Sequence, residues 1–333
     1  MFGMRKGNSQ SLSTPLLSRA GEPDAPATEH HAREEARKRL DGRLGLNVPY
    51  EWWPRAASLK AIEAAGFHWI QVASPPVDML AQPRHVVRHG EALRESLGVT
   101  SLHPVVHGPT DLQLGTPLHN RAFEGLLEYA HQLDATRVVY HALDFAKGGS
   151  ESEREELELR RLAGWAETLG VVICVENLCP VYPGGRSIAH DPEAVRALVD
   201  RCDSPAVRML LDIGHANVVA DHEGDDLVAL IEPVLDVVDL FHVHDNLGAR
   251  RQGGGGFAYD PLRLDLHLAP GEGTLPWERV ARALTGHEAP LVLEIHPSHR
   301  PRPATLHELA EAMLLQRKPQ LGPTPELFPS TPV

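Results

Sequence analysis

Side chains that bind divalent cations recur at the ends of short apolar runs in this sequence. The runs HPVVH, RVVYH and VVICVE end in such a residue, and so do LLDIGH, LFHVH and LVLE. A carboxylate or an imidazole removed from water is costly unless it is paired or bound to a metal. Imidazole and carboxylate together form the donor set of ions such as zinc and manganese. The residues concerned are His107, His141, Glu176, Asp212, His215, His242, His244 and Glu294.

A further pair of candidate ligands follows in LDLHL, where Asp265 and His267 are two residues apart. In an extended segment this spacing places both side chains on one side. The preceding loop, NLGARRQGGGGFAYDP, contains four consecutive glycines, which make it mobile. We expect Arg250 and Arg251 in this loop to meet a phosphate or carboxylate of a substrate as the loop closes. A solvated insertion without a ligand is the alternative.

Aromatic and cationic side chains near these runs are candidates for substrate contacts. Trp52 and Trp53 follow the first apolar run, and aromatic faces stack on sugar rings, although packing within the loop would explain the pair equally well. Arg186 lies in a loop after Glu176 and is a candidate for binding an anionic group of the substrate. His244 is a further candidate for substrate binding.

The elements that must position these residues alternate regularly. The expected strands are residues 44–48, 69–73, 101–107, 137–141, 171–177, 208–212, 239–244 and 291–296. Segments with helical spacing of apolar residues follow most of them, such as 121–133, 155–169 and 192–199. We therefore expect an α/β fold, a single (β/α)8 TIM barrel, whose active site lies at the carboxyl ends of its strands. A doubly wound open sheet is the main alternative, but no G-x-G-x-x-G or P-loop motif follows the first run.

Composition limits the classes of partner. The formal charge of −13 over 333 residues argues against duplex nucleic acid and favours a small-molecule substrate. Three cysteines without a C-x-x-C pair give little support to a disulfide framework. No signal-peptide core and no apolar run of about 18 residues occur, so we expect a cytoplasmic protein without a membrane partner. A homo-oligomer is compatible with the sequence.

The chain ends differ in composition from its centre. Residues 1–28 are rich in Ser, Pro, Gly and Ala, and residues 318–333 are rich in proline. Such segments bury too little apolar surface to offset their ordering entropy. We expect both tails to be disordered and residues 29–317 to form the barrel.

Over residues 43–316 the motifs resemble the xylose isomerase-like barrels, a family that includes sugar isomerases, epimerases and endonuclease IV. The isomerase branch implies one divalent metal held by Glu176, Asp212, His242 and Glu294. Spacing alone does not choose between His242 and His244, and the resemblance favours His242. The endonuclease IV branch implies up to three ions with nine ligands. In this chain those positions are His107, His141, Glu176, Asp212, His215, His242, Asp265, His267 and Glu294.

The resemblance implies a sugar or sugar-phosphate isomerase or epimerase that uses Mn, Zn, Mg or Co. Glu176 and Glu294 would then be the catalytic pair, removing and returning a proton beside a carbonyl. The first alternative is an endonuclease IV-like metal-dependent phosphoesterase acting on a small or single-stranded phosphodiester. A barrel that binds metal or sugar without turnover is the remaining alternative.

Overall fold

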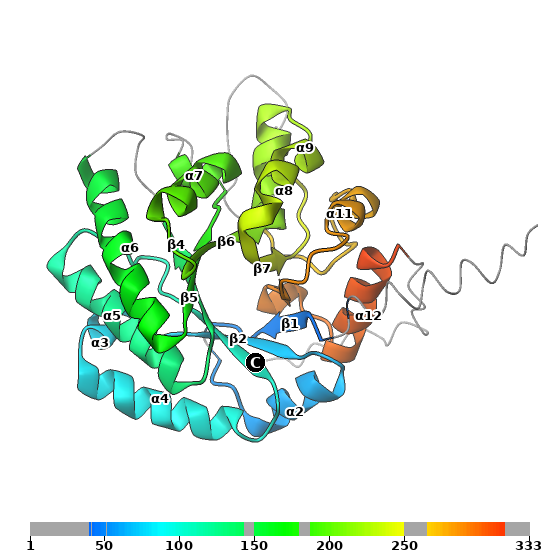
Figure 1. Cartoon of the computed structure of the whole chain (residues 1–333). Helices are drawn as coiled ribbons and strands as arrows, with labels where there is room; N and C mark the ends of the chain where they lie inside the picture. The colour runs from blue at the N-terminus through cyan, green and yellow to red at the C-terminus, as the bar shows by residue number, and fades with distance from the viewer. Residues whose placement is uncertain are drawn as a thin grey trace, which may run out of the picture.

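Eight parallel strands close into a barrel in chain order, with helices around the outside (Figure 1). This computed structural model describes residues 40, 42–50, 52–142, 150–179, 187–249 and 265–316. The barrel closes where β1 pairs with β8, from Leu44 against Leu291 to Leu46 against Leu293. The strands are β1 Leu44–Asn47, β2 Trp69–Ala73, β3 His103–His107, β4 Arg137–His141, β5 Val172–Glu176, β6 Val207–Asp212, β7 Val238–Val243 and β8 Leu291–Leu293.

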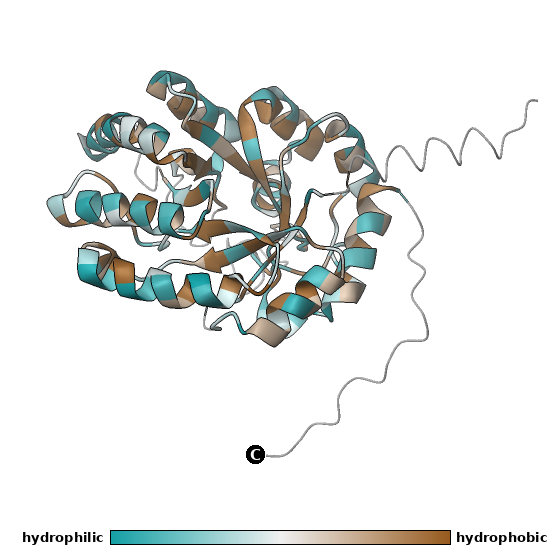
Figure 2. Ribbon diagram, turned by 60° about the horizontal axis from the view of Figure 1, so that its bottom comes forward, coloured by the Kyte–Doolittle hydropathy of each residue, from teal (hydrophilic) through white to brown (hydrophobic). Residues whose placement is uncertain are grey.

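The helices follow the strands and cover the barrel. Figure 2 shows brown, apolar strands at the centre and helices with teal, hydrophilic outer faces. The α-helices are α2 Ala56–Ala64, α3 Val77–Leu80, α4 Pro83–Leu97, α5 Pro117–Gln132, α6 Ser150–Leu169, α7 Pro192–Cys202, α8 Ile213–Glu223, α9 Leu227–Ile231, α11 Trp277–Ala283 and α12 Pro303–Leu314. Short 3-10 helices are η1 Ile188–His190, η2 Glu232–Val237 and η3 Pro297–His299.

The expected (β/α)8 barrel is confirmed, and the open doubly wound sheet is excluded by the pairing of β1 with β8. Each expected strand is present: 69–73 and 137–141 have the expected bounds, and the ends of the other six are shifted by one to three residues. Helix α8 was not expected, because no exposed polar face marks it in the sequence: eight of the eleven residues of α8 are buried. The proposed disordered tails lie outside the described residues.

An apolar layer lies inside the barrel directly beneath the candidate ligands. Its members are buried completely and belong to β3 through β8: Val105, Val139, Cys174, Leu210, Leu240 and Val292. Each stands two residues before a candidate ligand, because alternate side chains of a strand point to the same face. The strand pattern thus places a polar layer at the carboxyl ends of the strands on an apolar floor.

Two further features of the described chain bear on its class. Cys174, Cys179 and Cys202 are all free and buried. None of the helices in the described segments has the length and hydropathy needed to cross a lipid bilayer.

Candidate metal centre

The carboxyl ends of six strands deliver carboxylates and imidazoles to one mouth of the barrel. Glu176 is the last residue of β5 and Asp212 the last of β6, while Glu294 directly follows β8. His215 enters from the first turn of α8, and Asp265 and His267 come from the segment that precedes α11. The remaining contributors are His107 at the end of β3, His141 at the end of β4, and His242 and His244 at the end of β7.

These side chains form three groups, and in each group one ligand atom from every residue lies within 4.8 Å of those of the others. The first group is His107, His141 and Glu176. The second group is Glu176, Asp212, His242 and Glu294. The third group is His215, His244, Asp265 and His267. The structure therefore brings all nine residues of the expected ligand set together, adds His244, and makes Glu176 common to two groups.

Distances within the second group match those between ligands of one ion. Donor atoms about 2.0–2.2 Å from a tetrahedral ion are roughly 3.3–3.6 Å from one another. His242 Nδ1 lies 3.1 Å from Glu176 Oε1 and 3.3 Å from Glu294 Oε2. It lies 3.6 Å from Asp212 Oδ2. The shortest of these contacts is also within hydrogen-bond range, whereas the two longer separations suit a shared cation better than direct hydrogen bonds of about 2.9 Å.

Buried polar atoms without hydrogen bonds mark the same place. Among the described residues these atoms are His141 Nε2, Glu176 Oε2, Asp212 Oδ2, His244 Nε2 and Asp265 Oδ1. All five belong to the three groups. His141 Nε2 and Glu176 Oε2 lie 2.9 Å apart, yet they are not aligned as donor and acceptor. Since an unsatisfied buried polar atom costs about 1–3 kcal/mol, these residues fit a bound cation that would accept their lone pairs.

The second ring nitrogen of several imidazoles is held by an oxygen. The Nδ1 atoms of His107, His215 and His267 lie 2.7–2.8 Å from the carbonyl oxygens of Gly108, Asn177 and Glu294, respectively. A neutral imidazole that donates its Nδ1–H to a carbonyl presents an Nε2 lone pair. This orientation is typical of metal-binding histidines, whose other nitrogen is fixed by a hydrogen bond.

His242 is arranged in the opposite sense. Its Nε2 lies 2.7 Å from Gln71 Oε1, which leaves Nδ1 facing the carboxylates of the second group. Gln71 Nε2 in turn donates to Glu294 Oε1 at 2.8 Å. Gln71 therefore positions two members of the second group at once. The sequence interpretation missed Gln71, although a glutamine inside the apolar run WIQVA is a usable signal.

Burial and charge oppose each other in the titration of this centre. Burial favours the protonated form of Glu176, but His242 and His141 outweigh it and hold the pKa of that carboxyl well below its usual range. Burial disfavours the charged form of His242, but Glu294 and Glu176 hold its pKa well above the usual value. Burial by itself would lower the pKa of His267, but Asp265 outweighs burial and raises this pKa to about 9. Without a cation, His242 and His267 are therefore protonated at neutral pH beside ionised carboxylates, whereas burial, together with the neighbouring His141, lowers the pKa of His107.

The D-x-x-H spacing of Asp212 and His215 has a simple structural cause. Asp212 ends β6 and is also the N-cap of α8, where its Oδ1 accepts the backbone N–H of His215 at 2.7 Å. That bond leaves Oδ2 directed at the second group. Asn177 fixes the backbone of Asp212 with two hydrogen bonds, accepting its N–H at 2.8 Å and donating to its carbonyl at 3.0 Å.

The segment that carries Asp265 and His267 is fixed by its backbone. His267 adopts a positive φ of 47°, a conformation that non-glycine residues rarely hold without support. The next residue, Leu268, forms an antiparallel bridge with Asp245, with both N–H to O distances 2.8 Å. The carboxylate of Asp245 accepts hydrogen bonds from Gly271 N and Trp277 Nε1, so this residue supports the segment and belongs to none of the three groups.

A cavity of about 490 Å³ opens above the groups. Candidate ligands that line it include Glu176 and Glu294. None of its described lining residues is lysine or arginine; polar lining comes also from Asn47, Gln71 and Thr110. The sequence interpretation did not single out Asn47, which ends β1 at the level of the other ligand-bearing strand ends.

None of the expected substrate contacts that fall on described residues lines this cavity. Tyr50 lines it, but Trp52 and Trp53 do not. The Trp53 indole instead donates to Ser96 on α4, and Trp52 is 55% exposed. His244 is fully buried and lies behind the lining rather than in it. The candidates Arg186, Arg250 and Arg251 lie outside the described residues.

Comparison with known proteins agrees with this architecture. Residues 59–316 match the model of a family described as the xylose isomerase-like TIM barrel. No curated protein matches significantly.

Solved structures show similar folds. A D-tagatose 3-epimerase-like protein has a TM-score of 0.60 and 22% identity, covering 82% of this chain and 97% of its own. A D-psicose 3-epimerase from Clostridium cellulolyticum H10, solved with D-tagatose, has a TM-score of 0.57 and 17% identity, covering 82% of this chain and 96% of its own. The IOLI protein, solved with a zinc atom, has a TM-score of 0.58 and 18% identity, covering 82% of this chain and 97% of its own. At such identities the likeness establishes the fold.

Proposed function

Because this chain belongs to the xylose isomerase-like TIM barrel family, we propose that it is a divalent-metal-dependent isomerase or epimerase of a sugar-like substrate. The observation that carries the proposal is the pair of glutamates in the second group. Glu176 and Glu294 come from different strands, their ligand oxygens approach within 4.8 Å, and both line the cavity. Two carboxylates beside one cation and one substrate pocket suit removal and return of a proton.

The second group would hold the catalytic cation. Three carboxylates and one imidazole suit an oxygen-preferring ion of the Mn, Mg, Co or Zn type. When bound, such an ion polarises a carbonyl and makes the neighbouring C–H more acidic. The protein supplies the proton acceptor, since the pKa of Glu294 is lowered: burial opposes this shift, while His242, His267 and His107 outweigh burial. Glu294 is therefore ionised at neutral pH and able to accept a proton.

The lining favours a neutral polyhydroxy substrate. In the described part of the chain it offers hydroxyl, amide, imidazole and carboxylate groups but no cationic side chain that would pair with a phosphate. Asn47, Gln71 and Thr110 supply donors and acceptors of the kind that sugar hydroxyls need. The structurally similar D-psicose 3-epimerase was solved with the ketose D-tagatose, which guides the choice of substrates to test.

The test is exchange of a substrate C–H with solvent. Protein loaded with Mn²⁺ or Co²⁺ is incubated with a panel of ketoses in D2O, and deuterium incorporation and epimer formation are followed by NMR. The Glu294→Gln variant is expected to lose about 10²–10⁴-fold of the exchange rate, the usual contribution of a general acid or base. The matched control is Glu308→Gln, because Glu308 is exposed on α12. Unchanged exchange in Glu294→Gln would refute the assigned role.

A second candidate function is a phosphoesterase with several ions. It is favoured by the shared position of Glu176, which lets one carboxylate bridge the first and second groups. Clustered cations of this kind stabilise the attacking and leaving oxygens of a phosphoryl transfer. Hydrolysis of a small or single-stranded phosphodiester by zinc-loaded protein, with no deuterium exchange into any ketose, would select this alternative over the isomerase.

A further inference from the structure

We infer that Asn47 is a substrate-binding residue whose amide Nδ2 donates a hydrogen bond to a substrate oxygen that gains negative charge, and that Arg300 behind it is a positioning residue. The inference deepens the proposed function, on which it rests for the identity of the substrate. It stands on the place of Asn47 in the barrel, on the hydrogen bonds that occupy its side-chain oxygen, and on the buried charge of Arg300.

Asn47 belongs to the same layer of the barrel as the candidate ligands. Two residues before it, a Cβ atom at Gly45 would lie 3.0 Å from Cγ2 of Val292, a member of the apolar floor. Position 45 therefore faces the floor, and Asn47, two residues later on β1, faces the layer of the ligands. Asn47 is the register partner of Gln71 on β2, so the two strands that carry no carboxylate or imidazole place an amide in this layer.

Two donors occupy the side-chain oxygen of Asn47. The backbone N–H of Ile295, the residue after Glu294, donates to Oδ1 at 3.2 Å. Arg300 Nη1 donates to the same atom at 2.6 Å. Since a backbone N–H and a guanidinium can only donate, the atom that they share must be the amide oxygen. These two contacts therefore fix the orientation of the amide.

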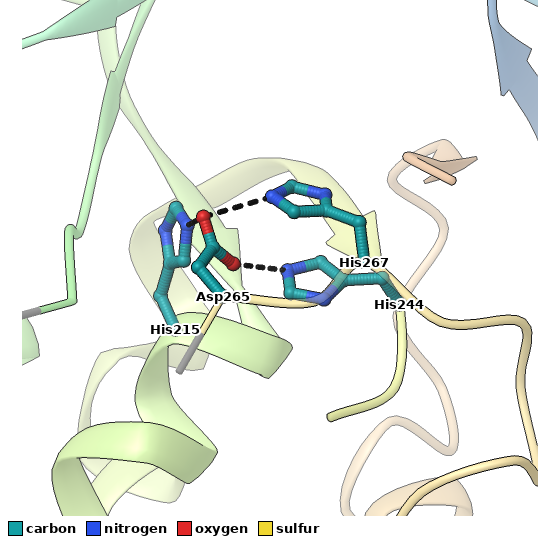
Figure 3. Close-up of side chains that lie close together, drawn as sticks. All are labelled: His215, His244, Asp265 and His267. Atoms are coloured by element: carbon teal, nitrogen blue, oxygen red, sulfur yellow. Dashed lines mark hydrogen bonds and ion pairs between the residues drawn. The ribbon is translucent and has the colours of Figure 1, made fainter. Parts of the chain in front are cut away.

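The amide nitrogen of Asn47 is left for the cavity. The residue lines the cavity of about 490 Å³, and its Nδ2 makes no hydrogen bond to any described residue. The third group offers a contrast: Figure 3 shows three imidazoles around the carboxylate of Asp265, so the polar side chains of that group face one another. An amide N–H only donates, so Nδ2 does not bind a cation and requires an acceptor oxygen from a ligand.

Arg300 places a positive charge behind this amide. Its guanidinium also donates to the backbone oxygens of Asn47 and Ile295, and no carboxylate of the described chain pairs with it. Burial lowers the pKa of Arg300 to about 10, so the guanidinium is still charged at neutral pH. A cation bound to Oδ1 draws electron density from the amide and makes its N–H a stronger donor. Such a donor favours an oxygen that becomes negative over a neutral hydroxyl.

The position next to Glu294 identifies that oxygen. The hydrogen bond from Ile295 ties the Asn47 side chain to the backbone beside Glu294, the proposed proton acceptor, and Asn47 and Glu294 both line the cavity. When the Glu294 carboxylate takes the proton from the carbon next to a carbonyl, the electron pair of the broken C–H bond moves towards the carbonyl, whose oxygen becomes an enediolate oxygen. Asn47 Nδ2 stabilises the charge on this oxygen. The substrate class is therefore an α-hydroxy carbonyl compound.

The kinetics of deuterium exchange in metal-saturated protein test this role. Asn47→Asp keeps an oxygen for Ile295 and Arg300 and removes only the donor, while Asn47→Ala removes the donor without adding charge. Both variants are expected to lose about 10²–10³-fold in kcat, with a much smaller change in KM. Arg300→Lys keeps the charge but not the planar fork and should lose roughly tenfold. The matched control is Arg302→Lys, because Arg302 is exposed and should leave exchange unchanged.

Metal content and melting temperature are measured in every variant, because a merely structural role of Asn47 would lower them together with exchange. The inference predicts that Asn47→Asp retains both. A loss of exchange that only follows a loss of metal would overturn it. A raised KM with unchanged kcat would also overturn it, because the hydrogen bond would then be equally strong before and during the reaction.

Binding of an enediolate analogue separates this inference from the proposed reaction. Calorimetry on metal-loaded protein compares glycolohydroxamate, which carries a negative oxygen, with the neutral polyol xylitol. Asn47→Ala is expected to weaken hydroxamate binding by roughly 10–100-fold, the usual effect of losing a hydrogen bond to a charged group, and to weaken xylitol binding much less. If wild type exchanges deuterium into no ketose, the isomerase proposal fails and the hydroxamate affinities alone decide. Equal affinities in wild type and Asn47→Ala, or no binding to wild type, would overturn the inference.

Discussion

At the scale of single residues, the ligand types and their positions on the chain are the most predictable part of this centre. His107, Glu176 and Glu294 could be singled out because each polar residue follows an apolar strand, and the structure brings all three to the mouth of the barrel. The sequence could not divide the candidates into groups. His242 and His244 illustrate the limit: they are two residues apart, yet they belong to different groups, because β7 ends between them.

The protonation of the metal-free centre predicts that metal binding releases protons. The pKa of His267 is about 9: burial opposes the rise, and Asp265 drives it. Below pH 9 this imidazole carries a proton that a cation must displace. The apparent metal affinity should therefore fall about tenfold for each unit by which the pH is lowered, for each proton released. Titration calorimetry at pH 7 in two buffers of different protonation enthalpy measures the number released. Heats that do not depend on the buffer would contradict the prediction.

Gln71 offers a test of positioning without removal of a ligand. Its amide joins His242 Nε2 at 2.7 Å and Glu294 Oε1 at 2.8 Å. Gln71→Ala is expected to weaken metal binding at the second group by about 10–100-fold, the usual effect of losing such a partner. Competition with a chromophoric chelator measures the change. Gln82→Ala, a change at an exposed position before α4, is the matched control.

At the scale of elements, periodicity two explains why the barrel was predictable. In β3 to β8, the candidate ligand and the apolar floor residue two positions before it point to the same face of the strand, as Cys174 and Glu176 do in β5. The same rule could not reveal α8, whose helix is buried on all sides, nor the placement of Trp53, which hydrogen-bonds to α4. Both depend on packing against other elements, which a local pattern does not encode.

The contact between α3 and α5 gives a prediction of stability. A Cβ atom at Gly125 of α5 would lie 2.0 Å from the carbonyl oxygen of Leu80 at the end of α3. Gly125→Ala should therefore destabilise the protein by about 1–3 kcal/mol through overpacking. Gly164→Ala on α6 is the matched control, because nothing lies within 4 Å of its Cβ position and the change should stabilise by about 0.5–1 kcal/mol. Urea denaturation measures both, and equal midpoints would contradict the packing argument.

At the scale of the whole molecule, the candidate ligands come from strands that are distant in sequence, so a bound ion would link these strands. The three groups draw on β3 to β8, on α8 and on the segment before α11, and the second group sets three carboxylates close together. An ion present at about 1,000 times its dissociation constant adds about 4 kcal/mol to the free energy of unfolding. Removing metal should therefore lower the melting temperature by roughly 10 °C for a domain of this size. Calorimetry with and without chelator measures the shift, and its absence would show that the folded state does not depend on bound ions.

The apolar floor of the barrel also bears on the order in which an ion and a substrate bind at the carboxyl ends of the strands. Val105, Val139 and the other members of that layer are fully buried, so these described side chains fill the barrel interior beneath the ligands. In the described part of the chain, the cavity above the second group, lined by Glu176 and Glu294, provides access to it. We therefore expect the ion to bind before the substrate, because a substrate in this cavity would block the ion's route to the second group. This order would follow from the six buried aliphatic or thiol side chains beneath the ligands, which perform no chemistry themselves.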